Sequence, residues 1–229
     1  LGTSNVDVGY DLTTGSDGSI YITGYTSGDL DGETNSGNSD AYISQFDANG
    51  NKIWTKLLGT DSNEYGEAIT TGSDGSLYVA GYTGGNLEGE NNSGLYDAFI
   101  SKFNTDGTKA WTKLLGTSDD DVGYDLTTGS DGSIYVTGYT EGDLDSEDNN
   151  GGFDAFISKF DTSGTQVWTQ LLGTSGDDRG FGLTSASDGS IYVTGSTGGD
   201  LDGQTNSGGA DAFISKFDTS GTQVWTQLL

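Results

Sequence analysis

The stretch Gly72-Ser73-Asp74-Gly75-Ser76-Leu77-Tyr78-Val79-Ala80-Gly81-Tyr82-Thr83 decides the fold. Its Asp-Gly pair precedes a run of β-branched and aromatic residues, which is typical of a tight turn followed by a strand. The same turn and strand recur at Gly15, Gly129 and Ala186, each copy beginning 57 residues after the last. Recurrence at a fixed period predicts a repeat architecture.

The whole chain follows this period. Tryptophans and a set of aspartates recur every 57 residues, at Trp54, Trp111, Trp168 and Trp225 and at Asp40, Asp97, Asp154 and Asp211. We therefore interpret residues 1–229 as a single array of four units, at approximately 1–57, 58–114, 115–171 and 172–229. Because the chain begins and ends in the same phase of the repeat, we expect it to be a segment of a longer or processed protein.

Each unit predicts four short antiparallel strands and no helix. The third unit shows the pattern, with expected strands at 124–128, 134–139, 154–160 and 166–172 and a long acidic loop at 141–152. Four-stranded units in tandem predict an all-β fold, a β-propeller with one unit per blade. The tight turns then lie at one end of each blade and the acidic loops at the other. Glycines are expected where the first strands crowd at the axis, at Gly9, Gly66, Gly123 and Gly180.

Composition excludes several classes of function. The formal net charge is −27, from 35 acidic and 8 basic side chains, so neither nucleic acid nor an anionic membrane surface is an expected partner. No apolar run is long enough for membrane insertion. Cysteine and histidine are absent, which excludes disulfides, thiolate metal sites and catalytic triads that need histidine.

Four stretches of the last unit resemble the bacterial β-propeller repeat family known as SBBP. They are Gly173–Asp178, Ser187–Gly195, Asp211–Asp218 and Trp225–Thr226. The resemblance covers the entire chain, once per unit. It implies a seven-bladed propeller fold and an extracellular or cell-surface location in a bacterium, and it implies no specific activity.

Four blades leave three ways to close a ring. Two chains can form an eight-bladed ring, further repeats can complete a larger one, or four blades can close by themselves. An isolated open array exposes an apolar blade face at each end, so we expect closure by self-association or by additional repeats.

The long loop of each unit is the first candidate site. Oxygen-bearing side chains stand at loop positions 1, 3, 5, 7 and 12, an alternation that suits the six to eight oxygen ligands of Ca²⁺. The predicted Ca²⁺ ligands are Asp29, Asp31, Asn35 and Asp40; Asn86, Glu88, Asn92 and Asp97; Asp143, Asp145, Asn149 and Asp154; and Asp200, Asp202, Asn206 and Asp211. In the alternative, the loops are solvated turns, and Asp40 and its equivalents cap backbone N–H groups.

Other residues recur at constant phase. One acid opens each unit, at Asp7, Glu64, Asp121 and Asp178, and is interpreted as a turn carboxylate or as a cation ligand. Aromatic residues are expected in the core rather than as sugar platforms, although the replacement of Tyr25, Tyr82 and Tyr139 by Ser196 predicts partial exposure there. Arg179 breaks the repeat and is interpreted as a surface charge.

Three hypotheses about function follow. The first is a non-catalytic structural, adhesive or interaction scaffold of a bacterial surface or secreted protein, stabilised by Ca²⁺ in its loops. It expects self-association and a protein or glycan ligand on the acidic-loop face. The second is a lectin-like propeller with one carbohydrate site per blade. The third is a hydrolase or lyase that uses loop carboxylates. It is ranked last because fourfold repetition argues against a unique active site.

Overall fold

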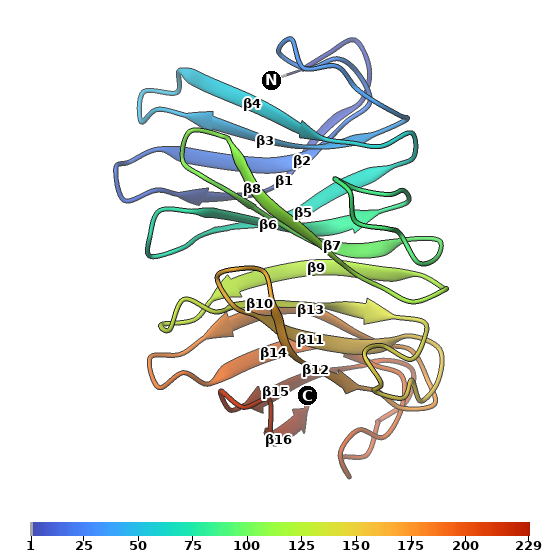
Figure 1. Ribbon diagram of the computed structural model, residues 1–229. Helices are drawn as coiled ribbons and strands as arrows, with labels where there is room; N and C mark the ends of the chain where they lie inside the picture. Colours follow the sequence, from blue (N-terminus) through green and yellow to red (C-terminus); the bar gives the residue numbers. More distant parts are fainter. Residues whose placement is uncertain (1) are drawn as a thin grey trace. The chain divides into compact units, whose positions relative to one another are not determined.

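The computed structural model describes residues 2–229, which form 16 β-strands and no helix (Figure 1). Nothing in this range therefore provides a helix with the length and apolar character to span a membrane. The strands form four sheets of four, one for each sequence repeat, and neighbouring strands in each sheet are consecutive in the chain. The predicted all-β fold of four-stranded antiparallel blades is confirmed.

The strands of the four blades have closely matching bounds. Blade 1 contains β1 (Asp7–Thr14), β2 (Ile20–Thr26), β3 (Asp40–Phe46) and β4 (Lys52–Leu58). Blade 2 contains β5 (Glu64–Thr71), β6 (Leu77–Thr83), β7 (Asp97–Phe103) and β8 (Lys109–Leu115). Blade 3 contains β9 (Asp121–Thr128), β10 (Ile134–Thr140), β11 (Asp154–Phe160) and β12 (Gln166–Leu172). Blade 4 contains β13 (Asp178–Ser185), β14 (Ile191–Thr197), β15 (Asp211–Phe217) and β16 (Gln223–Leu228).

The recurring Gly-Ser-Asp-Gly-Ser stretch, which is Ala-Ser-Asp-Gly-Ser in the fourth blade, joins the first two strands of each blade. In blade 2, Gly72 N donates to Ser76 O at 2.8 Å, and Gly75 N donates to Gly72 O at 3.0 Å. Gly75 has a φ of 81°, which a residue with a Cβ rarely adopts. Asp74 Oδ1 accepts a hydrogen bond from Ser76 N at 2.9 Å, so this carboxylate stabilises the turn.

Paired glycines mark a bulge in the first strand. Gly9 lies opposite Gly24, and the register between β1 and β2 shifts between Gly9 and Asp11. A Cβ on Gly24 would stand 1.9 Å from Val8 O. Crowding between blades is also evident, since a Cβ on Gly66 would stand 2.3 Å from Thr23 Oγ1 of the preceding blade. The expectation that first-strand glycines relieve crowding is confirmed at this junction.

The chain divides into two compact units, Leu1–Leu114 and Leu115–Leu229, with two blades in each. In the first unit, a core between the blades joins Ala41 and Ile43 of blade 1 to Ile69, Val79 and Phe99 of blade 2. In the second unit, an equivalent core lies between blades 3 and 4. Strands apolar on both faces are thus explained by blade-to-blade packing within each unit.

The acidic loops of adjacent blades meet inside each unit. In the first unit, Asn38 N donates to Ser62 O at 3.1 Å and Glu64 N donates to Ser39 O at 2.7 Å. The end of one long loop therefore pairs with the loop that opens the next blade. This confirms, for that blade junction, that the two kinds of acidic loop share one end of the sheets.

Candidate functional site

Each long loop begins with a two-residue hairpin of its own. In blade 1, Leu30 N and Glu33 N exchange hydrogen bonds with Glu33 O and Leu30 O, both at 3.0 Å. The two residues between them, Asp31 and Gly32, have φ values of 57° and 88°. Positive φ at both central positions is the type I′ geometry. The Asp-Gly signal for this second hairpin is present in the sequence at Asp31-Gly32, within the stretch predicted only as a long loop.

The third loop position points away from the loop and toward the fourth strand. Asp31 Oδ2 accepts a hydrogen bond from Thr55 Oγ1 at 2.7 Å, and Asp31 also pairs with Lys52. Burial acts to raise the pKa of Asp31, but the Lys52 ammonium and the Thr55 hydroxyl outweigh it and lower that pKa. In blades 3 and 4 the equivalent bonds join Asp145 to Thr169 and Asp202 to Thr226.

The first and seventh loop positions bind each other. Asp29 Oδ1 accepts a hydrogen bond from Asn35 N at 3.0 Å, and Asn35 Nδ2 donates to Thr26 O at 3.0 Å. The same pairing holds in the other three loops, between Asn86 and Asn92, Asp143 and Asn149, and Asp200 and Asn206. These side chains close the loop onto the end of the second strand.

The aspartate at the twelfth loop position caps backbone N–H groups of the loop. Asp40 is fully buried, and its Oδ2 accepts a hydrogen bond from Ser36 N at 2.9 Å. Burial raises the pKa of Asp40, more than the backbone N–H groups of Ser36 and Gly37 lower it. Equivalent bonds are made by Asp97, Asp154 and Asp211. The capping role expected for this position is confirmed in every blade.

The predicted Ca²⁺ ligands therefore do not all converge. The structure brings positions 1 and 7 together, directs position 3 to the fourth strand, and buries position 12 at the base of the loop. In the described part of the chain, no three acidic side chains gather in a metal-binding group. Asn and backbone oxygens also bind Ca²⁺, so the long-loop sites stay a prediction.

The acid that opens each blade organises the opening loop. Asp178 Oδ2 accepts hydrogen bonds from Thr174 N at 2.7 Å and from Thr174 Oγ1 at 2.8 Å. Asp7, Glu64 and Asp121 bind the threonine four residues before them in the same way. These contacts are those of a turn carboxylate, one of the two roles that the sequence allows for this acid.

Aromatic rings form a ladder beside the acidic loops. In the first unit, Tyr10, Tyr25, Tyr65, Tyr82 and Tyr96 follow one another at centroid distances of 5.8, 4.8, 4.9 and 5.3 Å. Tyr25 and Tyr82 are half-buried, as the replacement by serine in the fourth unit predicts. These rings offer an apolar surface at the end of the blade that carries the loops.

Arg179 belongs to the matching cluster of the second unit. Its guanidinium lies 3.9 Å from the centroid of the Phe153 ring and 5.5 Å from that of Tyr139. It also pairs with Asp177 at 3.3 Å. The interpretation of Arg179 as a simple surface charge is incomplete, because its flat face covers aromatic carbon as well.

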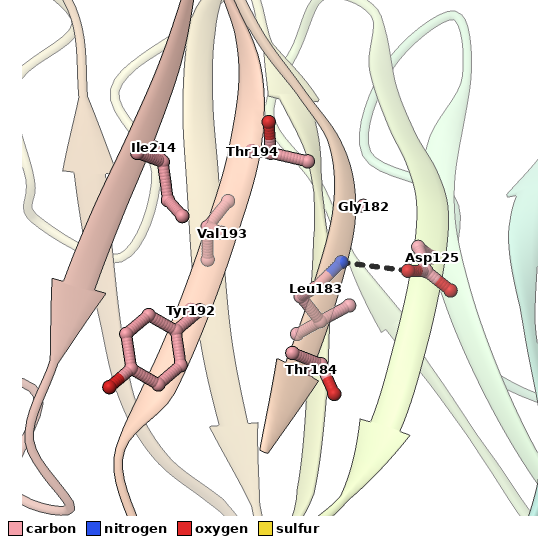
Figure 2. A pocket seen from close by; sticks show the side chains of 8 residues that line it. All are labelled: Asp125, Gly182, Leu183, Thr184, Tyr192, Val193, Thr194 and Ile214. Atoms are coloured by element: carbon pink, nitrogen blue, oxygen red, sulfur yellow. Dashed lines mark hydrogen bonds between the residues drawn. The ribbon is translucent and has the colours of Figure 1, made fainter. Parts of the chain in front are cut away.

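A cavity of about 290 Å³ lies in the second unit, against β13, β14 and β15 (Figure 2). Leu183, Tyr192 and Ile214 contribute apolar lining, and Asp125 contributes a carboxylate. Asp125 Oδ2 accepts a hydrogen bond from Leu183 N at 2.7 Å, drawn as the dashed line in Figure 2. This acid therefore joins two blades, and the lining does not contain the pair of carboxylates typical of glycoside hydrolysis.

The bond made by Asp125 has a counterpart that sequence reasoning missed. In the first unit, Asp11 Oδ2 accepts a hydrogen bond from Ile69 N at 2.8 Å. Blades 2 and 4 carry Ala68 and Gly182 at the position of these aspartates. An acid inside a strand, present in alternate repeats, is the signal that identifies this link between blades.

Comparison with known proteins agrees with the blade architecture. The beta-propeller repeat family SBBP matches residues 53–88, 110–145 and 167–202. The chain therefore contains repeats of the SBBP family. Each matched SBBP segment runs from the fourth strand of one blade through the first two strands of the next.

Two longer proteins are related in sequence to this SBBP chain. Regulatory protein FlaEY of Caulobacter vibrioides is 33% identical over 186 residues, which cover 72% of this chain and 20% of that protein. An uncharacterized WD repeat-containing protein of Acanthamoeba polyphaga mimivirus is 22% identical over 200 residues, covering 70% of this chain and 14% of that protein. The SBBP chain thus spans a small part of each relative's length.

The fold is also found among solved structures. A polysaccharide lyase, an ulvan lyase, superimposes with a TM-score of 0.52 at 12% sequence identity. The match covers 93% of this chain and 56% of the lyase chain. At this identity the similarity describes the propeller architecture alone.

Proposed function

We propose that this chain is a non-catalytic interaction scaffold, a run of SBBP blades in a bacterial surface or secreted protein. The observation that carries the proposal is the equivalent use of acids in successive blades. Asp40 and its equivalents cap the long loops, and Asp7 and its equivalents organise the opening loops. Acids that repeat as structural elements support a repetitive surface rather than a single catalytic centre.

The first blade exposes a face whose equivalent on the second blade is covered by a neighbouring blade. Leu12 on β1 is 62% exposed, whereas Ile69, its equivalent on β5, is 4% exposed. Ile69 is covered by blade 1, because it shares a core cluster with Ala41 and Ile43. We propose that a blade from a second copy of the chain covers Leu12 in the same way.

The fourth blade supplies the complementary face. Ile43 on β3 and Ile157 on β11 are fully buried, while the equivalent Ile214 on β15 is only partly buried. Inside each unit, the equivalents of Ile214 pack toward the equivalents of Leu12, as Ile43 does toward Ile69. Contact between Leu12 of one copy and Ile214 of another therefore repeats a junction the chain already uses.

The similar proteins are compatible with this role. The Caulobacter vibrioides relative is named as a regulatory protein, which supports a role in protein interactions. The lyase similarity supports the fold but does not transfer an activity, because 12% identity does not carry catalytic residues.

Sedimentation velocity tests the scaffold proposal. We expect the wild-type chain to sediment as an assembly larger than its 23.7 kDa mass. Leu12→Asp places a charge in the proposed interface and is expected to shift the chain toward the monomer. Ile53→Asp is the matched control, because Ile53 is 56% exposed and its equivalents Val167 and Val224 are exposed to a similar extent.

Association that survives Leu12→Asp, or that is lost equally in Ile53→Asp, would contradict the proposed interface. A monomeric wild type would contradict self-association itself.

A lectin-like role is the second candidate, favoured by one observation. The half-buried tyrosine ladder of the first unit lies beside the acidic loops, where sugar rings can stack on exposed aromatic faces. Binding on a glycan array that is lost in Tyr82→Ala would favour this role over a purely protein-binding scaffold.

A further inference from the structure

Two fully buried acids meet where blade 3 joins blade 4. Asp154 begins β11 and Asp178 begins β13, and neither side chain is exposed. Asp178 N donates to Phe153 O at 2.6 Å, so the two strands begin side by side. The junction lies inside the second unit and is separate from the hairpin at the start of the long loop.

The two carboxylates contact consecutive residues, Gly173 and Thr174. A Cβ on Gly173 would stand 2.0 Å from Asp154 Cγ, which places the Asp154 carboxylate directly against Gly173. Asp178 Oδ2 accepts hydrogen bonds from the backbone N and the hydroxyl of Thr174, the next residue. Burial raises the pKa of Asp154, and the nearby charge of Asp178 acts in the same direction.

Each acid keeps one oxygen without a partner. Asp154 Oδ2 accepts a hydrogen bond from Asn150 N at 2.9 Å, but Asp154 Oδ1 and Asp178 Oδ1 are buried and accept none. Within residues 2–229, the ion pairs formed by lysine and arginine do not include either acid. Burying two carboxylate oxygens without a donor or a cation is costly.

We propose that Asp154 and Asp178 together bind a Ca²⁺ ion at the junction of blades 3 and 4. The two carboxylates supply a charge of −2 and hard oxygen donors, which match a divalent cation of this class. Without cysteine or histidine the chain offers no soft or imidazole ligands. The remaining ligands have to come from backbone oxygens of the two loops that meet here. The ion ties one blade to the next.

The first unit contains a natural contrast. There Asp40 meets Glu64, whose longer side chain is satisfied by protein donors. Glu64 Oε2 accepts from Thr60 N at 2.6 Å, and Oε1 accepts from the hydroxyls of Thr60 and Thr83, both at 2.7 Å. Of the carboxylate oxygens of Asp40 and Glu64, only Asp40 Oδ1 is buried without a donor, whereas both Asp154 and Asp178 have one, so the first-unit junction has a smaller need for a cation. We therefore assign the ion to the Asp154–Asp178 junction and not to the Asp40–Glu64 junction.

Calorimetric titration of CaCl₂ into the chelator-treated 229-residue chain tests the assignment. The wild type is expected to bind Ca²⁺ and to gain thermal stability from it. Asp178→Glu copies the first-unit junction at constant charge, and Asp154→Asn removes one carboxylate; each is expected to lose one bound Ca²⁺. Asp143→Asn changes the long loop of the same blade and is the matched control, expected to keep that ion.

A gain-of-site variant makes the test independent of folding defects. Glu64→Asp should add one bound Ca²⁺ at the first-unit junction, with the far-ultraviolet circular dichroism spectrum unchanged. Failure of the wild type to bind Ca²⁺ would overturn the proposal. So would loss of the ion in Asp143→Asn but not in Asp178→Glu, which would place it in the long loop. Stabilisation of the wild type by mild acid alone, with no effect of Ca²⁺, would show that a shared proton replaces the ion.

Discussion

Glu67 departs from the repeat in residue type. The other blades carry Tyr10, Tyr124 and Phe181 at this position, so a carboxyl group occupies a place where rings otherwise lie. Glu67 is partly buried, and burial raises its pKa to about 7. A raised pKa means that the folded state holds the proton more tightly than the unfolded state does.

This pKa predicts a pH dependence with a defined sign. The stabilisation from protonated Glu67 is complete below its ordinary pKa of 4.5 and is lost as the pH rises through about 7. We expect the free energy of unfolding of the wild type, relative to Glu67→Gln, to fall by up to about 3 kcal/mol across that window, because one pKa unit corresponds to about 1.4 kcal/mol. Thermal unfolding of both proteins over this range measures it. A difference that does not change with pH would refute the assignment.

The sequence predicts residue roles well where one role recurs in each blade. For Asp40 and its equivalents the sequence leaves two roles open, Ca²⁺ ligand and loop cap, and all four residues cap the loops. The direction of each side chain was harder to predict from the sequence. The spacing of the oxygen-bearing residues Asp29, Asp31 and Asn35 suits a cation, but spacing alone does not determine where each side chain points. The positive φ of Asp31 turns its carboxylate toward Thr55 and Lys52, and only the folded hairpin shows this.

In blades 1 and 3, the tryptophan of the fourth strand donates a hydrogen bond to the following blade. Trp54 Nε1 donates to Thr105 O at 3.3 Å, and Trp168 Nε1 donates to Thr219 O at 3.4 Å. The Trp168 ring lies against the turn at Gly221, where a Cβ would stand 2.8 Å from it. Core packing is predicted from the sequence for these tryptophans. The structure confirms packing against the core and adds the hydrogen bond to the next turn.

Trp168→Phe is expected to lower the free energy of unfolding by about 1–2 kcal/mol, because it removes one hydrogen bond and part of a partly buried ring. Trp225→Phe is the matched control: Trp225 is 38% exposed in the last blade, and its replacement should change stability by less than about 0.5 kcal/mol. Chemical denaturation followed by circular dichroism compares the two. Equal losses would show that the bond to the next blade contributes little.

At the scale of the whole molecule, the 57-residue period was enough to predict four antiparallel blades, because each repeat encodes its own turns and strands. How blades continue beyond the ends of an array does not follow from the period. It depends on faces such as those of Leu12 and Ile214, whose equivalents inside the chain are covered by neighbouring blades. The central claim is that a second copy covers these faces head to tail.

Cross-linking of two single-cysteine variants tests that claim most directly, because the wild type has no cysteine to react. Leu12→Cys and Ile214→Cys are prepared separately and treated with a short bismaleimide, alone and mixed. The account predicts covalent dimers in the mixture and only monomers in either variant alone. Dimers within a single variant, or none in the mixture, would contradict head-to-tail association through these blade faces.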